Sequence, residues 1–306
     1  MSEQAVRYEL PTKQYIKNKE QEKADVIKKL EKGVKDIFTS DKYKEFLRTY
    51  AQFHNYSINN TILILMQNPR SSHVASFKTW RKLGRSVKKG EKGIKVLVPI
   101  PYKYEKQVED RQGQSEVAEY EGISFRLGNV FDISQTEGKE LPSLVNELKD
   151  NSPEIRKAIE AVCYASDVPV YYDTAMGGET KGYYHLKEKY ISIRYGMSDS
   201  QTFKTVVHEI AHSRIHGKDD KFNRKEREVQ AESISYVVCS RYGIDTSAYS
   251  FGYIAGWSSD KNAKELGSSL HLVQESSDKI IKRIDKALGN KTIEELAKRK
   301  SQERVR

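Results

Sequence analysis

Two histidines and the glutamate between them have the residue types and spacing that suit zinc chemistry, in the run His208-Glu209-Ile210-Ala211-His212. On an α-helix the two histidines lie on one face about one turn apart, so both imidazoles can bind one zinc ion. Glu209 follows the first histidine and is placed to act as general base on a metal-bound water. A five-residue pattern with three fixed positions, such as H-E-x-x-H, arises by chance in roughly one chain in a hundred of this composition. The surrounding elements must therefore support the interpretation.

The residues around this motif predict the elements that it needs. Ser198 and Gln201 form a capping-box pattern at the start of a helix that is expected to end at Gly217. Upstream, residues 189–194 alternate between polar and apolar types, and we expect them to form the edge strand beside the active site. Next to the histidines the helix carries an apolar stripe of Phe203, Val206, Val207 and Ile210.

A second helical pattern supplies carboxylates for a third metal ligand. Zinc that keeps one position open for water needs three protein ligands. Glu228 and Glu232 lie one helical turn apart on one face, and apolar residues occupy the opposite face. Gly243 is expected to close this helix.

The order of strand, H-E-x-x-H helix and E-x-x-A-acidic helix resembles the gluzincin type of metallopeptidase. The resemblance implies that Glu228 is the third zinc ligand and that Glu232 contacts a ligand histidine and fixes its tautomer. The reverse assignment of these two carboxylates stays open. His216 extends the run to H-E-x-x-H-x-x-x-H, but the glycine and longer spacing of metzincins are absent, and a solvated or hydrogen-bonded histidine is the ordinary interpretation.

Donors for a developing oxyanion are less well specified by the sequence. Tyr183, Tyr184 and His185 precede the expected edge strand, and His271 lies in an amphipathic helical pattern over residues 266–288. Core packing is the better explanation for any one of these tyrosines, since the chain contains 19 of them.

The composition is that of a polar, basic, globular protein. With 306 residues the chain has room for two domains, and its net charge of +10 favours a polyanionic partner, with solubility as the ordinary alternative. Cys163 and Cys239 form no C-x-x-C pair, which indicates reduced thiols of a cytosolic protein. The longest apolar run, residues 62–66, is far shorter than the roughly 20 residues of a membrane span. We therefore expect a cytoplasmic protein with no membrane partner.

The first 140 residues predict helices followed by a small antiparallel sheet. Helical patterns cover residues 13–35, 40–55, 57–67 and 75–83. A basic, glycine-containing turn over residues 84–93 then precedes strand patterns at 94–98 and 125–133, which flank a long hairpin tip or flexible insertion. In the turn, glycines allow close approach to phosphates, lysines supply charge, and Phe77 and Trp80 could stack on unpaired bases. A core aromatic under a solvated hairpin is the commoner meaning of such a pattern.

Several motifs in this region resemble the N-terminal domain of ArdC-type antirestriction proteins and of the related LtrC-like proteins of conjugative elements. The motifs are Asn55-Tyr-Ser-x-x-Asn60, Gln67-Asn-Pro69, Phe77-x-x-Trp80, Leu83-Gly-Arg-x-Val-x-Lys-Gly-Glu-Lys-Gly-Ile94 and Val130-Phe-Asp-Ile-x-Gln-Thr136.

The resemblance implies an α+β chain with an N-terminal domain that binds single-stranded DNA and a C-terminal zincin-like metallopeptidase domain. The expected division is an ArdC-type domain over 1–140, a linker over 141–152, a gluzincin-type domain over 153–290 and a charged, fraying tail over 291–306. The expected DNA contacts are Asn55, Asn60, Phe77, Trp80, Arg81, Arg85, Lys88, Lys89 and Lys92.

Together these patterns predict a zinc endopeptidase located on single-stranded DNA, which protects incoming DNA of a mobile element or cleaves a DNA-associated protein. Zn²⁺ would be held by His208, His212 and Glu228, with Glu209 as the base; the peptide substrate is unspecified. Two alternatives remain. The chain could be a non-catalytic DNA-coating protein with structural zinc, or a repressor-cleaving peptidase of the ImmA/IrrE kind, which shares the E-x-x-A pattern.

Overall fold

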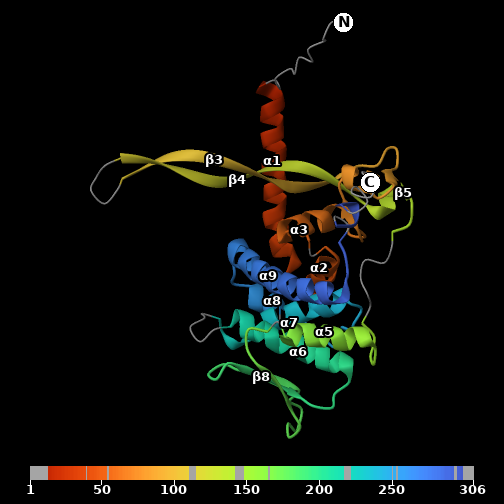
Figure 1. The fold of residues 1–306 in the computed structure, drawn as a ribbon. Helices are drawn as coiled ribbons and strands as arrows, with labels where there is room; N and C mark the ends of the chain where they lie inside the picture. Colours follow the sequence, from red (N-terminus) through yellow and green to blue (C-terminus); the bar gives the residue numbers. More distant parts are fainter. Residues whose placement is uncertain are drawn as a thin grey trace.

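Helices form the body of the molecule, a long two-stranded hairpin projects from its side, and a small sheet lies at the end opposite the N-terminal helix α1 (Figure 1). The computed structural model describes residues 13–38, 40–53, 55–109, 115–141, 148–164, 166–216, 222–249, 251–252, 254–292 and 295–298. Among these residues, no helix combines the length and the apolar character needed to cross a membrane.

Three helices come first: α1 (Lys13–Ile37), α2 (Ser40–Gln52) and α3 (Ile58–Gln67). At the start of α3 the Ser57 hydroxyl accepts a hydrogen bond from the backbone N–H of Asn60, which satisfies one of the free N–H groups of the first turn. The helices bury apolar stripes that include Leu30, Val34, Tyr43, Phe46, Leu47, Tyr50 and Ile62. The predicted helices are therefore confirmed, although α2 ends earlier than predicted because Phe53 leaves it to join a separate apolar cluster under the hairpin.

The hairpin consists of β3 (Ile94–Glu109) and β4 (Ser115–Asp132), paired antiparallel along their whole length. Its base is anchored because Ile94, Val96 and Val130 are buried in the cluster that also holds Phe53. The outer part projects from the body (Figure 1) and carries exposed tyrosines. Short strands and a helix complete this region: β1 (Val74–Ala75), α4 (Phe77–Lys82), β2 (Arg85–Val87), a 3-10 turn (Ile133–Gln135) and β5 (Thr136–Gly138). The predicted hairpin is confirmed, and each of its two strands is continuous over the bounds given above.

The second half contains a three-stranded sheet with strand order β6-β8-β7, in which β8 pairs parallel to β6 and antiparallel to β7. Its elements are α5 (Pro153–Tyr164), β6 (Val170–Asp173), β7 (Gly182–His185), β8 (Tyr190–Arg194), α6 (Asp199–Ile215), α7 (Arg224–Arg241), α8 (Ile254–Ser258) and α9 (Ala263–Leu288).

The prediction that residues 189–194 form the edge strand is wrong. These residues form the central strand β8, and Ile191 and Ile193 are fully buried in the helical core. β7 is the edge strand that lies next to α6. Alternation of residue types shows that one face of a strand is buried, but it does not show how many neighbours the strand has.

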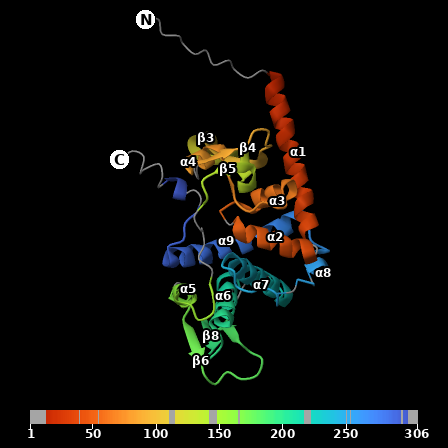
Figure 2. The same cartoon turned by 90° about the vertical axis from the view of Figure 1, so that its right-hand side faces the viewer.

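One apolar core runs through both halves of the chain. The helices of the two halves lie against one another (Figures 1 and 2). α2 packs on α7, and α1 and α3 contact α9. A buried hydrogen bond of 2.9 Å joins the Tyr43 hydroxyl on α2 to the Ser233 hydroxyl on α7. The predicted division at 141–152 stays a prediction, and most of that linker lies outside the described residues. In the charged tail, by contrast, Ala297 is buried in the apolar cluster that holds Trp80, so this described part of the tail is docked.

Candidate metal centre

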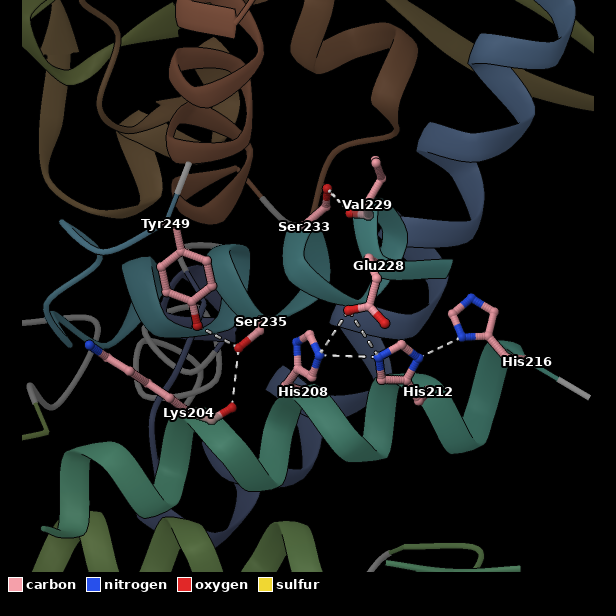
Figure 3. Close-up of polar contacts among 9 residues, drawn as sticks. All are labelled: Lys204, His208, His212, His216, Glu228, Val229, Ser233, Ser235 and Tyr249. Carbon is pink, nitrogen blue, oxygen red and sulfur yellow. Dashed lines mark hydrogen bonds and ion pairs between the residues drawn. The ribbon is translucent and has the colours of Figure 1, made fainter. Parts of the chain in front are cut away.

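The two helices that carry the predicted ligands are fixed by their first turns and by contacts between them. The Ser198 hydroxyl accepts from Gln201 N–H at the start of α6, as the sequence predicted, and Asn223 and Glu226 form a capping box at the start of α7. Farther along, the Ser235 hydroxyl of α7 donates to the carbonyl of Lys204 on α6 at 3.3 Å (Figure 3). These contacts fix the register of one helix against the other.

The side chains of His208, His212 and Glu228 converge between these helices (Figure 3). The Nε2 atoms of the two histidines are 3.1 Å apart, and Glu228 Oε2 lies 3.6 Å from His208 Nε2 and 3.7 Å from His212 Nε2. Ligand atoms that each lie about 2 Å from a tetrahedral zinc ion are roughly 3.3 Å from one another. The donor set therefore fits one ion, and two imidazoles with one carboxylate are a set that catalytic zinc takes.

The charges of these groups favour cation binding. The hydrogen bond from His208 is the main cause that holds the pKa of the Glu228 carboxyl far below its ordinary value, so it is ionised at neutral pH. Burial lowers the pKa of His208, but the hydrogen bond and charge of Glu228, with the charges of Glu209 and Glu232, outweigh burial and leave that pKa raised. The imidazoles thus lie in a negative environment that a divalent cation would neutralise.

Glu209 is buried, with 8% of its surface exposed, and lies beside the ligands on α6. Burial is the main cause of its raised pKa, and the charges of His208 and His212 oppose the shift. A hydrogen bond from the backbone of Tyr184 on β7 also reaches this carboxylate. A carboxylate with a raised pKa, held at a fixed position beside a metal, has the properties of a general base.

Glu232 lies one turn after Glu228 on α7 and lines a cavity of about 510 Å³ that also borders His208. It is not a member of the group of converging ligand atoms, which contains Glu228. The prediction that Glu232 orients a ligand histidine does not hold for His212, because His212 Nδ1 lies 2.9 Å from His216 Nδ1. The sequence could not exclude Glu232, because both carboxylates share one face of the helix.

A second cavity, of about 690 Å³, borders the ligands on the side of β7. Tyr183 and Tyr184 line it, whereas His185 stacks on Tyr190 with ring centroids 5.0 Å apart, and the exposed His271 lines neither cavity. Gly182 lines this cavity as well, whereas the sequence did not point to three other lining residues: Phe222, Arg224 and Arg227. Arg224 directly follows the Asn223 cap of α7, and Arg227 directly precedes the ligand Glu228. Their places in the first turns of the ligand-bearing helix are the signal that could have identified them.

Two residues expected to contact DNA have structural roles instead. Trp80 is fully buried and its Nε1–H donates to the carbonyl of Phe131 at 2.8 Å, so it cannot stack on a base. The Asn60 amide bonds to the backbone of Leu97 on the outer edge of β3, with Oδ1 accepting at 2.8 Å and Nδ2 donating at 2.9 Å. These contacts satisfy groups that an edge strand leaves unpaired, and they correct both predictions.

Some basic residues of the predicted DNA-binding set also make hydrogen bonds within the protein, whereas others are exposed. The Arg85 guanidinium donates to Thr136 Oγ1 at 2.8 Å and to the carbonyls of Thr136 and Lys139 at 3.0 and 2.6 Å, so it holds β2 against β5. Arg85 is half-buried, and its contact with DNA stays a prediction. The exposed Lys88 reaches the Ser134 carbonyl at 2.8 Å. Other members of the predicted set are exposed: Asn55, Phe77, Arg81, Lys89 and Lys92.

Residues 17–131 match the family model described as the N-terminal domain of anti-restriction factor ArdC. The chain is ArdC-like. The ArdC-like chain is 28% identical over 316 residues to an uncharacterized Bacillus anthracis protein, pXO2-81, in an alignment that covers 89% of this chain and 53% of that protein. It thus spans about half the length of this curated relative.

Two crystal structures of the antirestriction ArdC protein from the R388 plasmid are also similar to the ArdC-like chain. The metal-free structure is 21% identical with a TM-score of 0.42, over 78% of this chain and 87% of that one. The Mn(II)-bound structure is 20% identical with a TM-score of 0.43, over 75% and 85%. Because the family model ends before α6, the metal centre of the ArdC-like chain rests on its own geometry.

Proposed function

We propose that this ArdC-like chain is a zinc-dependent endopeptidase that its N-terminal half brings to single-stranded DNA. One observation carries the proposal: the ligand atoms of His208, His212 and Glu228 converge at a cleft beside the buried carboxylate of Glu209. Zinc is the ion proposed because of this donor set, whose three protein ligands leave one position open.

The residues of the cleft divide the work of peptide hydrolysis. When bound, zinc supplies a Lewis acid and lowers the pKa of a coordinated water. Glu209 accepts a proton from the attacking water and delivers it to the leaving amine, which its raised pKa favours. Glu228 stays ionised and places one negative charge among the ligands. The outer edge of β7 can pair with an extended peptide at Gly182, since Gly182 and Tyr183 line the cleft and the Tyr184 N–H already donates to Glu209.

The proposed DNA contacts lie on α4 and on the turn that joins β2 to β3. Phe77 is 49% exposed and offers a ring for stacking on an unpaired base, the role that buried Trp80 cannot fill. Arg81, Lys89 and Lys92 are also exposed and can neutralise phosphates. Such a chain would protect the incoming DNA of a mobile element, or cleave a protein bound to that DNA, as a member of an antirestriction family would.

The direct test compares zinc-loaded wild type with Glu209→Gln on β-casein and on a mixed peptide library, with products identified by mass spectrometry. The amide is isosteric, so zinc binding should persist while cleavage falls by about 100-fold or more. Glu160→Gln on the exposed face of α5 is the matched control and should cleave normally. Full cleavage by Glu209→Gln, or no cleavage by the zinc-loaded wild type on any substrate, would contradict the proposal.

A further inference from the structure

His216 lies one turn beyond His212 at the end of α6 and is buried, with 3% of its surface exposed. Its Nδ1 atom is 2.9 Å from His212 Nδ1, the ring nitrogen that faces away from the other ligands (Figure 3). Its Nε2 atom is 3.0 Å from Oε1 of Gln230, which is 1% exposed on α7. These contacts form a buried chain from a predicted ligand on one helix to an amide on the other.

This chain of contacts specifies where the protons lie. An amide oxygen only accepts, so His216 carries its proton on Nε2 and presents a lone pair at Nδ1. His212 must then donate from Nδ1, since two neutral imidazoles share one proton across this contact. The lone pair of His212 is left on Nε2, the atom that faces His208 and Glu228. That tautomer is the one a metal requires.

We propose that His216 and Gln230 are a positioning pair that holds His212 in its metal-binding tautomer and ring orientation. The inference rests on the proposed metal centre and deepens it. Outer partners of this kind are commonly carboxylates or backbone carbonyls. Here His216 and Gln230 are both neutral. Glu228 therefore contributes the one negative charge of the ligand set, and the residues behind His212 add no charge. Because the pair spans α6 and α7, metal affinity depends on the packing of the two helices.

The first experiment measures zinc affinity by competition with a chromophoric chelator, using the full chain at neutral pH. His216→Leu keeps the approximate volume but removes the acceptor, and it should weaken zinc binding by about 10-fold to 100-fold. In His216→Asn the amide oxygen takes the place of Nδ1, and most of the affinity should return. Gln230→Leu should also weaken binding, because His216 loses the contact that fixes its own proton.

His271→Leu, an exposed histidine on α9, is the matched control and should bind zinc as the wild type does. Thermal unfolding of each metal-free variant separates loss of affinity from loss of folding. Equal affinity of wild type and His216→Leu would overturn the positioning pair. An equal loss in the Asn and Leu variants would also overturn it, because His216 would then act as a ligand in its own right.

The second experiment needs no metal. Nitrogen-15 NMR of the metal-free wild type should show His212 protonated at Nδ1 and His216 protonated at Nε2, and His216→Leu should release His212 from this single tautomer. The opposite pair of tautomers in the wild type would overturn the proposal. A wild type that binds no divalent ion would overturn both the metal centre and the pair. A wild type that binds zinc but does not respond to His216→Leu would overturn the pair alone.

Discussion

Replacing Asn60 by leucine should destabilise the protein by releasing β3 from α3. The side-chain amide makes hydrogen bonds of 2.8 and 2.9 Å to the N–H and carbonyl of Leu97, and leucine of similar size can make neither. At about 1 kcal/mol net for each bond, the loss is about 2 kcal/mol. Leucine also has the higher helix propensity, which returns roughly 0.5 kcal/mol.

The neighbouring Asn59 provides a matched control, because it lies in the same first turn of α3 and is exposed. Asn59→Leu should gain the helix propensity without losing the hydrogen bonds, so the two variants should differ by about 2 kcal/mol in free energy of unfolding. Urea titration of the full chain measures this difference. Hydrogen exchange at the Leu97 amide should accelerate in Asn60→Leu alone.

The opposite pattern would refute the reasoning. If Asn60 contacts DNA, Asn60→Leu and Asn59→Leu should have the same stability, and only Asn60→Leu should weaken the binding of single-stranded DNA.

Three further predictions concern other parts of the fold. Trp80→Phe should lower the free energy of unfolding by about 1–3 kcal/mol through loss of the bond to Phe131, and the folded variant should bind DNA normally; a DNA defect in a stable variant would contradict the buried role. Phe77→Ala should weaken binding to a single-stranded oligonucleotide by about 1–3 kcal/mol, with little effect on stability, if that ring stacks on a base; unchanged affinity would remove Phe77 from the interface. Burial raises the pKa of Asp278 from 3.8 to about 6, so its contribution to stability is fully present below pH 3.8 and is lost as the pH rises through 6. Relative to wild type, Asp278→Asn should therefore gain stability over that range, and a constant difference across it would contradict the assignment.

The local features of the metal centre could be predicted from the sequence because they depend on helix geometry. Residues four apart share a helical face, so His208 and His212 had to lie together once α6 formed. The first turns of α6 and α7 follow from polar caps that act within a few residues. The choice of Glu228 over Glu232 depends on how α7 is rotated against α6, which no local pattern specifies.

The features that sequence analysis missed depend on contacts between distant segments. The apolar alternation of residues 189–194 was the same for a central and an edge strand, and the pairing with β6 and β7 decided between them. Trp80 lies among basic residues in the chain, but in the fold it belongs to an apolar cluster with Leu83 and with Ala297 from the tail. His216 was set aside as a ligand because the metzincin glycine and spacing are absent. The role inferred from the structure depends on Gln230 of the neighbouring helix, and no local pattern shows that contact.

Zinc binding by two isosteric variants tests the central claim most directly. Native mass spectrometry and chelator competition on the full chain should show one zinc ion bound to the wild type, with Glu228→Gln severely weakened because it loses the ionised carboxylate near both imidazoles. Glu232→Gln should keep the ion, since its carboxylate lies outside the converging ligand atoms. Zinc lost by Glu232→Gln and kept by Glu228→Gln would contradict the account.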